Sequence, residues 1–226
     1  MPPIRITRPL TTMKKTEILP FDTALYPPLV RVVDDDEEVR FSLSYSFRVA
    51  KIDCVTYASA REFLNKDDHR RPGCCVLDLT MPEMTGLELQ AEMLERGIDL
   101  PVIFLSGNGD VHSAVTALQK GAIDFMEKPY KPARLRDRVK EMIEKNLNER
   151  REAARVADMR ERFDSLTRRE KLVIRYVAQD LINREIGEKL SIQEQTVKTH
   201  RSNGCNKLGA HSALEVYHLL QAIGEI

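Results

Sequence analysis

Residues 76–82, with the sequence Val-Leu-Asp-Leu-Thr-Met-Pro, decide the fold that we predict for this chain. The apolar residues Cys75, Val76 and Leu77 lead directly into Asp78, and a proline ends the run four residues later. A short continuous apolar run favours a strand that is covered on both faces, as in a parallel sheet. The carboxyl end of such a strand is where open α/β sheets place their functional residues. We therefore predict that Asp78 lies at the mouth of a sheet, although a solvated turn aspartate would leave the same pattern.

Strand-like and helix-like segments alternate outward from this run in both directions. The expected strands cover residues 29–33, 52–57, 75–77, 102–106 and 122–126. The expected helices cover residues 39–50, 59–64, 85–96 and 110–120. Five strands that alternate with helices are typical of a doubly wound parallel sheet of the α/β class. Residues 1–28 contain six prolines and no periodic pattern, so we expect a flexible N-terminal extension there.

Length and composition are those of a globular protein with one or two domains. Lys and Arg together number 35, as do Asp and Glu, so the net charge of the 226 residues favours no class of partner. No apolar run approaches the roughly 18 residues that span a membrane. The first residues also lack the apolar region of a secretory signal. We therefore expect a cytoplasmic protein without a membrane partner.

The four cysteines, Cys54, Cys74, Cys75 and Cys205, do not have the spacing of metal ligands. Cys74 and Cys75 are adjacent in a predicted strand, so their side chains should point to opposite faces of the sheet. We interpret them as small core residues of a protein in a reducing compartment.

A long charged helix is predicted after the sheet. Between Pro132 and Phe163 no further Gly or Pro interrupts the helical pattern, which is near 50 Å long at about 1.5 Å per residue. Leu135, Val139 and Met142 form an apolar seam, but its continuation reaches Asn146 and is broken. We interpret residues 131–163 as the final helix of the α/β domain that continues as a solvated linker helix, and a dimerisation helix is the alternative.

A second, all-α domain is predicted at residues 164–226. Its first helix begins at a capping box, Thr167-Arg168-Arg169-Glu170, in which two side chains satisfy free backbone N–H groups. Apolar periodicity predicts helices at residues 167–179, 183–190, 194–208 and 212–223. The second and third of these are joined by three residues, which is the spacing of a helix-turn-helix.

Polar side chains end four of the five predicted strands at one edge of the sheet. They are Asp34 with Asp35, Asp78, Ser106 and Lys128. Three carboxylates within a few ångströms of each other repel unless a cation joins them, and an all-oxygen ligand set suits Mg²⁺. The set therefore predicts a Mg²⁺ pocket in which a phosphoryl group is transferred to Asp78 while Ser106 and Lys128 contact its oxygens. The acids that follow, at residues 36–38, do not need a role in this pocket, because acidic side chains in the first turn of a helix interact favourably with its positive end.

Helix 194–208 carries cations and hydroxyl donors that suit DNA. Lys and Arg bind guanine edges or phosphates, and Thr and Ser bind either. The candidate DNA-contacting residues are Arg184, Thr196, Lys198, Thr199, Arg201, Ser202 and Lys207. A solvated helix face is the alternative interpretation of the same residues.

Residues 29–130 resemble the receiver domain of response regulators. The resemblance rests on Asp34-Asp35, the run 77–82, Ser106-Gly107, Phe125 and Lys128-Pro129. It implies a flavodoxin-like strand order, 2-1-3-4-5. It also implies a cis peptide bond before Pro129.

The same resemblance implies a role for each residue of the pocket. Asp78 would be the phosphoacceptor, and Mg²⁺ would be held by Asp34, Asp35, Asp78 and the backbone carbonyl of Thr80. Ser106 would be the switch hydroxyl, Phe125 the aromatic residue that follows it inward, and Lys128 the phosphate contact. The donor would be a sensor histidine kinase, and phosphorylated receivers would form a homodimer through residues 110–126.

Residues 164–224 resemble a LuxR-type DNA-binding domain, and the whole chain is similar to the FixJ/NarL family of response regulators. The matching segments are 166–170, 183–186, 196–201 and 206–209. The resemblance implies promoter DNA and the transcription machinery as partners. Departures from the family pattern occur at Gln193, Asp180, Gly187 and Gly204, of which Gly204 lies inside the recognition helix and costs about 1 kcal/mol relative to Ala.

The combined prediction is a transcription regulator controlled by phosphorylation, and not an enzyme. One alternative is a regulator that binds DNA without phosphate. The other is a Mg²⁺-dependent phosphotransferase that uses Asp78 as its nucleophile, although no second acid that could protonate a leaving group is evident beside it.

Overall fold

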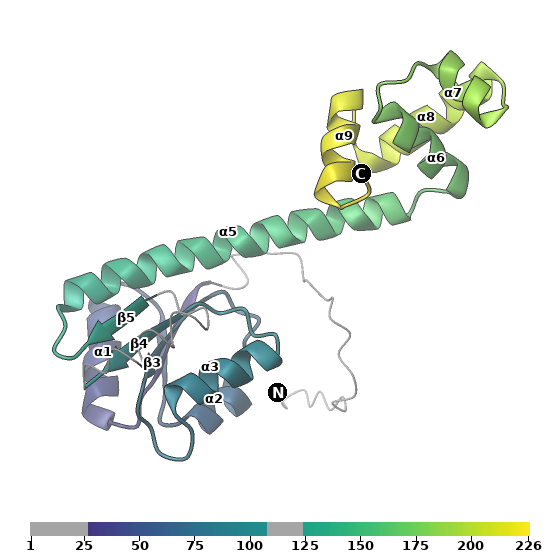
Figure 1. Ribbon diagram of the computed structural model, residues 1–226. Coiled ribbons are helices and arrows are strands. Elements are labelled where there is room, and N and C mark those ends of the chain that lie inside the picture. The colour runs from purple at the N-terminus through teal and green to yellow at the C-terminus, as the bar shows by residue number, and fades with distance from the viewer. Residues whose placement is uncertain (1–26, 108–123) are drawn as a thin grey trace, which may run out of the picture. The chain divides into compact units, whose positions relative to one another are not determined.

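The computed structural model describes residues 27–107 and 124–226. These residues fall into two compact units, which divide between Arg151 and Glu152. The first unit is α/β and the second is helical (Figure 1). In the described part of the chain, no helix is both long and apolar enough to cross a membrane.

The first unit contains five parallel strands in the order β2-β1-β3-β4-β5, which confirms the predicted fold class and strand order. They are β1 Leu29–Val33, β2 Cys54–Tyr57, β3 Gly73–Asp78, β4 Val102–Ser106 and β5 Asp124–Glu127. Asp78 pairs with Leu105, and Ser106 pairs with Glu127, so the carboxyl ends of β3, β4 and β5 are aligned. The predicted start of the second strand was wrong by two residues, because Ile52 N donates to Phe47 O and closes the preceding helix instead.

Helices cover both faces of this sheet. They are α1 Glu37–Val49, α2 Ala60–Lys66, α3 Gly86–Glu95 and α5 Pro132–Asp164, which extends beyond the first unit. Helices α2 and α3 lie on one face and α1 and the start of α5 on the other (Figure 1). Ser59 caps α2 by accepting from Glu62 N, and the Glu62 side chain accepts from Ala58 N just before the helix. The predicted helix 110–120 lies outside the described residues.

Alternate strand residues divide the core into two layers. Cys75, Leu77 and Phe104 pack with α2 and α3, whereas Cys74 and Val76 pack with α1 and α5. The two adjacent cysteines therefore point to opposite faces, as predicted, and burial raises the pKa of Cys75 to about 12. Not every apolar residue of the predicted helices is buried, because several lie on the faces that turn toward solvent. The large exposed ones are Phe41, Tyr45, Val49, Leu94, Leu214 and Tyr217.

Asn146 corrects the prediction that the apolar seam of α5 is broken. This residue, predicted to break the apolar seam, is fully buried behind Leu135, Val139 and Met142. Its Nδ2 donates to Asp99 O, and its Oδ1 accepts from Gly73 N, each at 3.0 Å. The seam therefore continues through a satisfied polar residue, and this part of α5 is a packed helix of the first unit.

The second unit is built from the end of α5 and four further helices. They are α6 Arg168–Val177, α7 Asn183–Leu190, α8 Glu194–Leu208 and α9 Ala213–Ala222. The capping box of Thr167 and Glu170 is present as predicted. Val173, Ile174, Val197 and Leu208 are buried in one core, against which Val156 and Met159 of α5 also pack.

The glycines that depart from the family pattern lie where helices approach closely. A Cβ atom on Gly204 would lie 2.8 Å from Ile174 Cγ1, and one on Gly187 would lie 2.8 Å from Ile192 O. Gly204 therefore permits α6 and α8 to touch, and Gly187 permits the turn of the helix-turn-helix to fold back. Asp180 adopts a left-handed conformation with φ +61°, which glycine would adopt with less strain.

Candidate functional site

One ammonium group joins two of the predicted carboxylates at the carboxyl edge of the sheet. Lys128 Nζ lies 2.7 Å from Asp78 Oδ1 and 3.0 Å from Asp34 Oδ2. The backbone N–H of Lys128 donates to Ser106 O at 2.7 Å, which links the ends of β4 and β5. The peptide bond between Lys128 and Pro129 is cis, as the resemblance implied. The structure therefore brings together residues that lie up to 94 positions apart in the sequence.

Asp78 is oriented through both of its carboxylate oxygens. While Oδ1 accepts from Lys128, Oδ2 accepts from Thr80 N at 2.7 Å. The backbone beneath it is equally constrained, because a Cβ atom on Gly86 would lie 2.3 Å from Asp78 O. Asp78 is 8% exposed, so this fixed carboxylate remains within reach of solvent.

The electrostatics of the pocket favour cations. Burial raises the pKa of Asp34, which is 1% exposed, and its hydrogen bond with Lys128 only partly opposes that effect. Burial also acts to lower the pKa of Lys128, but hydrogen bonds with Asp78 and Asp34 outweigh it and raise that pKa. The ammonium is thus held in its charged form, while the buried Asp34 carboxylate remains short of positive charge.

The remaining predicted residues of the pocket closely follow the two acids or lie on the strands β4 and β5. Asp35 follows Asp34 and is exposed, Thr80 is exposed, Ser106 is buried, and Phe125 is half-buried against the layer beneath α2 and α3. Within residues 27–107 and 124–226, no three His, Cys, Asp or Glu side chains are grouped closely enough to hold a metal ion. The donor chemistry still fits Mg²⁺, because the pocket offers carboxylate oxygens as ligands and two of its carboxylates, Asp34 and Asp78, share a single ammonium group.

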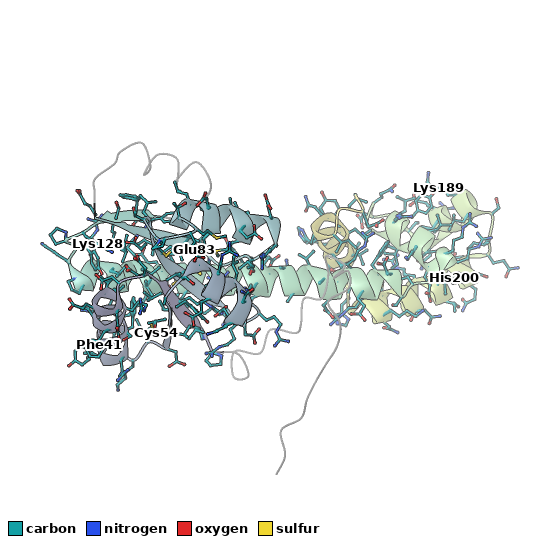
Figure 2. The ribbon with its side chains drawn as sticks, turned by 90° about the horizontal axis from the view of Figure 1, so that it is seen from below. Phe41, Cys54, Glu83, Lys128, Lys189 and His200 are labelled. Atoms are coloured by element: carbon teal, nitrogen blue, oxygen red, sulfur yellow. The ribbon has the colours of Figure 1, made fainter. Side chains whose placement is uncertain are left out.

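The predicted DNA-contacting residues lie mainly on the exposed side of α8. Thr196, Lys198, Thr199 and Ser202 are exposed, and Lys198 is 3.2 Å from Glu194 on the preceding turn. Gln193 begins the helix without a side-chain cap. Figure 2 shows His200 of α8 and Lys189 of α7 among the side chains of this unit.

Several of the predicted DNA contacts also have partners within the protein. Lys207 Nζ is 2.8 Å from Glu170 Oε2, and Glu170 is 4% exposed, so this pair joins α8 to α6. Arg201 Nη1 donates to Asn183 Oδ1 at 3.1 Å. Arg184 is exposed and 3.9 Å from Glu188. These contacts hold Arg201 and Lys207 in place beside the exposed face of α8.

A polar hollow beside α8 was not predicted from the sequence. It has a volume of about 350 Å³ and lies between α8, the start of α7 and the turn before α9. Its lining includes Lys198, Arg201 and His211. Only His211 among these was absent from the predicted set, because nothing in the local pattern indicates that the turn folds back toward α8.

Comparison with known proteins identifies both units. Residues 30–140 match the response regulator receiver domain, and residues 164–220 match the bacterial regulatory proteins of the luxR family. The transcriptional regulatory protein FixJ of Rhizobium meliloti is 33% identical over 195 residues, which are 86% of this chain and 96% of that protein. This chain belongs to the response regulator family.

Other similar proteins are also response regulators that match most of this chain. The response regulator protein TodT of Pseudomonas putida is 33% identical over 86% of each chain. The low-resolution structure of the response regulator StyR superposes with a TM-score of 0.80 at 35% identity, covering 86% of this chain and 98% of that one. The response regulator is therefore a DNA-binding transcription regulator of a two-component system, whose partners include a sensor kinase and DNA.

Proposed function

We propose that this response regulator accepts a phosphoryl group on Asp78 from a sensor histidine kinase, and that the modification controls binding of α8 to promoter DNA. The observation that carries the proposal is the position of Lys128 Nζ, 2.7 Å from Asp78 Oδ1 and 3.0 Å from Asp34 Oδ2. A carboxylate already paired with a cation and already oriented by a backbone amide is prepared for phosphoryl transfer.

The transfer forms one bond and breaks one. An oxygen of the Asp78 carboxylate attacks the phosphorus of a phosphohistidine, the P–N bond breaks, and the imidazole leaves with the electron pair and takes up a proton. Lys128 balances charge on the phosphoryl oxygens, and Thr80 N continues to hold the second carboxylate oxygen. Asp34, Asp35, Asp78 and the Thr80 carbonyl would hold Mg²⁺, which would supply further positive charge to those oxygens.

The switch depends on bonds that form only after phosphorylation. The phosphoryl group adds roughly −1.5 to −2 units of charge beside β4 and β5. The Ser106 hydroxyl and the Lys128 ammonium contact phosphoryl oxygens in that state alone, and such a difference shifts a pre-existing equilibrium. Phe125 on β5 follows Ser106 inward. The surface proposed for the homodimer, residues 110–126, lies mostly outside the described residues.

The output follows from the exposed face of α8. In the phosphorylated homodimer two copies of α8 enter successive major grooves, with half-sites about one helical turn apart. Lys198, Thr199, Ser202 and Thr196 face the bases and phosphates, with Arg201 beside them. Arg184 and Lys207 contact the backbone, for which Lys207 must share its charge with Glu170. The bound dimer then contacts the transcription machinery.

The test compares the wild-type chain with Asp78→Asn in the presence of Mg²⁺ and acetyl phosphate. We expect the intact mass of the wild type to increase by one phosphoryl group, and its affinity for DNA selected from a random pool to rise. Asp78→Asn should show neither change.

The alternatives give different results in the same test. Equal DNA affinity of the wild type with and without phosphodonor would support a regulator that works without phosphate. Multiple turnover of a generic phosphate ester would instead support a phosphotransferase.

A further inference from the structure

Arg40 contacts the back of the loop that presents the two acids. Its Nη1 donates to Asp34 O and to Asp35 O, each at 2.8 Å. Arg40 lies in the first turns of α1 and is half-buried, whereas the acids precede the helix. One guanidinium nitrogen therefore ties together the two consecutive carbonyls of the acid pair.

The other bonds of this loop fix Asp34 more firmly than Asp35. Asp34 Oδ1 accepts from Asp36 N at 2.9 Å, and Asp34 Oδ2 accepts from Lys128. Asp36 is in turn the N-cap of α1, accepting from Glu38 N at 2.8 Å. The side chain of Asp35 is exposed, so the position of its carboxylate depends on its backbone, which Arg40 holds.

We propose that Arg40 is a positioning residue for the Mg²⁺ ligands, acting through the carbonyls of Asp34 and Asp35. The inference rests on the proposed function, because it assumes that this acid pair binds the ion. Mg²⁺ requires nearly octahedral ligands at about 2.0–2.1 Å, so a loop that moves by a few tenths of an ångström loses affinity. A carbonyl bonded to a guanidinium makes a charge-assisted hydrogen bond, which holds the loop better than a neutral donor would.

The charge of Arg40 acts in the opposite direction to its hydrogen bonds. A guanidinium near the pocket repels a divalent cation, so removal of the charge alone would tighten Mg²⁺ binding. Removal of the two bonds would weaken it by releasing the loop. The sign of the change in affinity therefore distinguishes positioning from simple electrostatics.

The experiment is a calorimetric titration of the full chain with MgCl₂. We expect Arg40→Met to raise the Kd for Mg²⁺ about tenfold. The loss of affinity is moderate because water partly replaces the two charge-assisted hydrogen bonds that Arg40 makes. Arg40→Lys, which keeps a charged donor, should restore about half of that loss on a logarithmic scale. Arg48→Met is the matched control, since Arg48 is an exposed cation in the last turn of the same helix, and its Kd should remain that of the wild type.

A second measurement needs no metal. In the absence of Mg²⁺, the Asp36 amide, which donates to Asp34 Oδ1, should exchange with deuterium faster in Arg40→Met than in the wild type. Arg40→Lys should restore slow exchange, and Arg48→Met should leave it unchanged. If Arg40→Met does not fold, Arg40→Gln carries the same expectations.

Two results separate this inference from the function on which it rests. A wild type that does not bind Mg²⁺ contradicts the proposed function itself. A wild type that binds Mg²⁺, together with a folded Arg40 variant that binds it as tightly or more tightly, overturns only the positioning role.

Discussion

At the scale of single residues, the contact between Lys128 and the carboxylates of Asp34 and Asp78 links the charge of the pocket to the stability of the fold. Asp34 is almost completely buried, and burial raises its pKa despite the ammonium beside it. A carboxyl group whose pKa is higher in the folded state stabilises the fold while it is protonated, and that stability is lost as the pH rises through the folded-state pKa. Charge on Asp34 is thus tolerated at neutral pH mainly because Lys128 is present.

We predict that Lys128→Met destabilises the first unit by about 1–3 kcal/mol at neutral pH, since it leaves a buried carboxylate without its cation. The loss should shrink as the pH falls, because the pKa of Asp34 rises further in the variant and protonation then removes the charge. Urea unfolding of the variant and the wild type over a series of pH values measures this difference. A loss of stability that does not change with pH would contradict it.

At the scale of elements, helix α5 is held to the sheet by a polar residue as well as by its apolar seam. Asn146 satisfies the amide of Gly73 and the carbonyl of Asp99, so two loops depend on one side chain. Arg150, one turn further, donates to Asp99 Oδ2 at 2.9 Å and to the carbonyls of His69 and Arg70. The end of α5 within the first unit is therefore fixed by specific bonds.

We predict that Asn146→Ala lowers the free energy of unfolding by about 2–4 kcal/mol, because it leaves a buried donor and an acceptor unpaired and opens a cavity. Asn148→Ala is the control, since Asn148 is exposed on the same helix and its replacement should change stability by less than about 0.5 kcal/mol. Equal effects of the two substitutions on denaturant unfolding would show that the buried bonds contribute little.

Where α6 and α8 approach at Gly204, helix propensity favours a larger residue but packing does not. Alanine in the interior of α8 would gain about 1 kcal/mol of propensity. Its Cβ atom, however, would lie 2.8 Å from Ile174 Cγ1 and 3.0 Å from Ile174 Cδ1.

We predict that Gly204→Ala is destabilising by about 1–3 kcal/mol, because overpacking outweighs the gain in propensity. In an Ile174→Ala background, which removes both of the crowding atoms, the same substitution should become stabilising. Thermal unfolding of the four proteins of this double-mutant cycle gives the interaction energy, and additive effects would exclude the clash as the cause.

At the scale of the whole molecule, we expect substitutions on the DNA-binding face to change DNA recognition without changing the response to phosphorylation. Lys198 belongs to the exposed face of α8, whereas Asp78 belongs to the pocket of the other unit. We predict that Lys198→Ala weakens specific DNA binding by about 1–3 kcal/mol, in the phosphorylated and unphosphorylated states alike, if Lys198 contacts a base. Titration of labelled DNA with each protein, with and without acetyl phosphate, measures both effects.

Lys189→Ala provides the control for that measurement. Lys189 is an exposed lysine of α7 whose ammonium lies 5.9 Å from the centre of the Tyr176 ring. Its replacement should leave sequence discrimination unchanged. Loss of discrimination in Lys189→Ala but not in Lys198→Ala would move the recognition surface from α8 to α7.

Local patterns were sufficient to predict the buried parallel strands and the meeting of three pocket residues, whereas the strand order was implied by the family resemblance. Apolar runs that end in Asp78 and Ser106 define buried parallel strands, and parallel strands bring their carboxyl ends to one edge. The convergence of Asp34, Asp78 and Lys128 follows from that geometry without any knowledge of side-chain contacts.

Buried polar contacts, by contrast, were decided by the tertiary structure alone. Arg31 lies inside a β-branched strand, yet it is fully buried and donates through Nε to Asp67, which is 36 residues away at the end of α2. Tyr57 donates to the same carboxylate at 2.7 Å.

The sequence by itself thus determined the α/β class of the first unit, the helical class of the second and the convergence of Asp34, Asp78 and Lys128, because hydrophobic periodicity is a local property of the chain. Only the fold decided that Asn146 and Arg31 are buried, and that Arg40 supports the acid pair. Whether a polar side chain is buried depends on the partners that reach it, and the partners of Asn146 and Arg31 come from distant segments that meet only after the chain has folded.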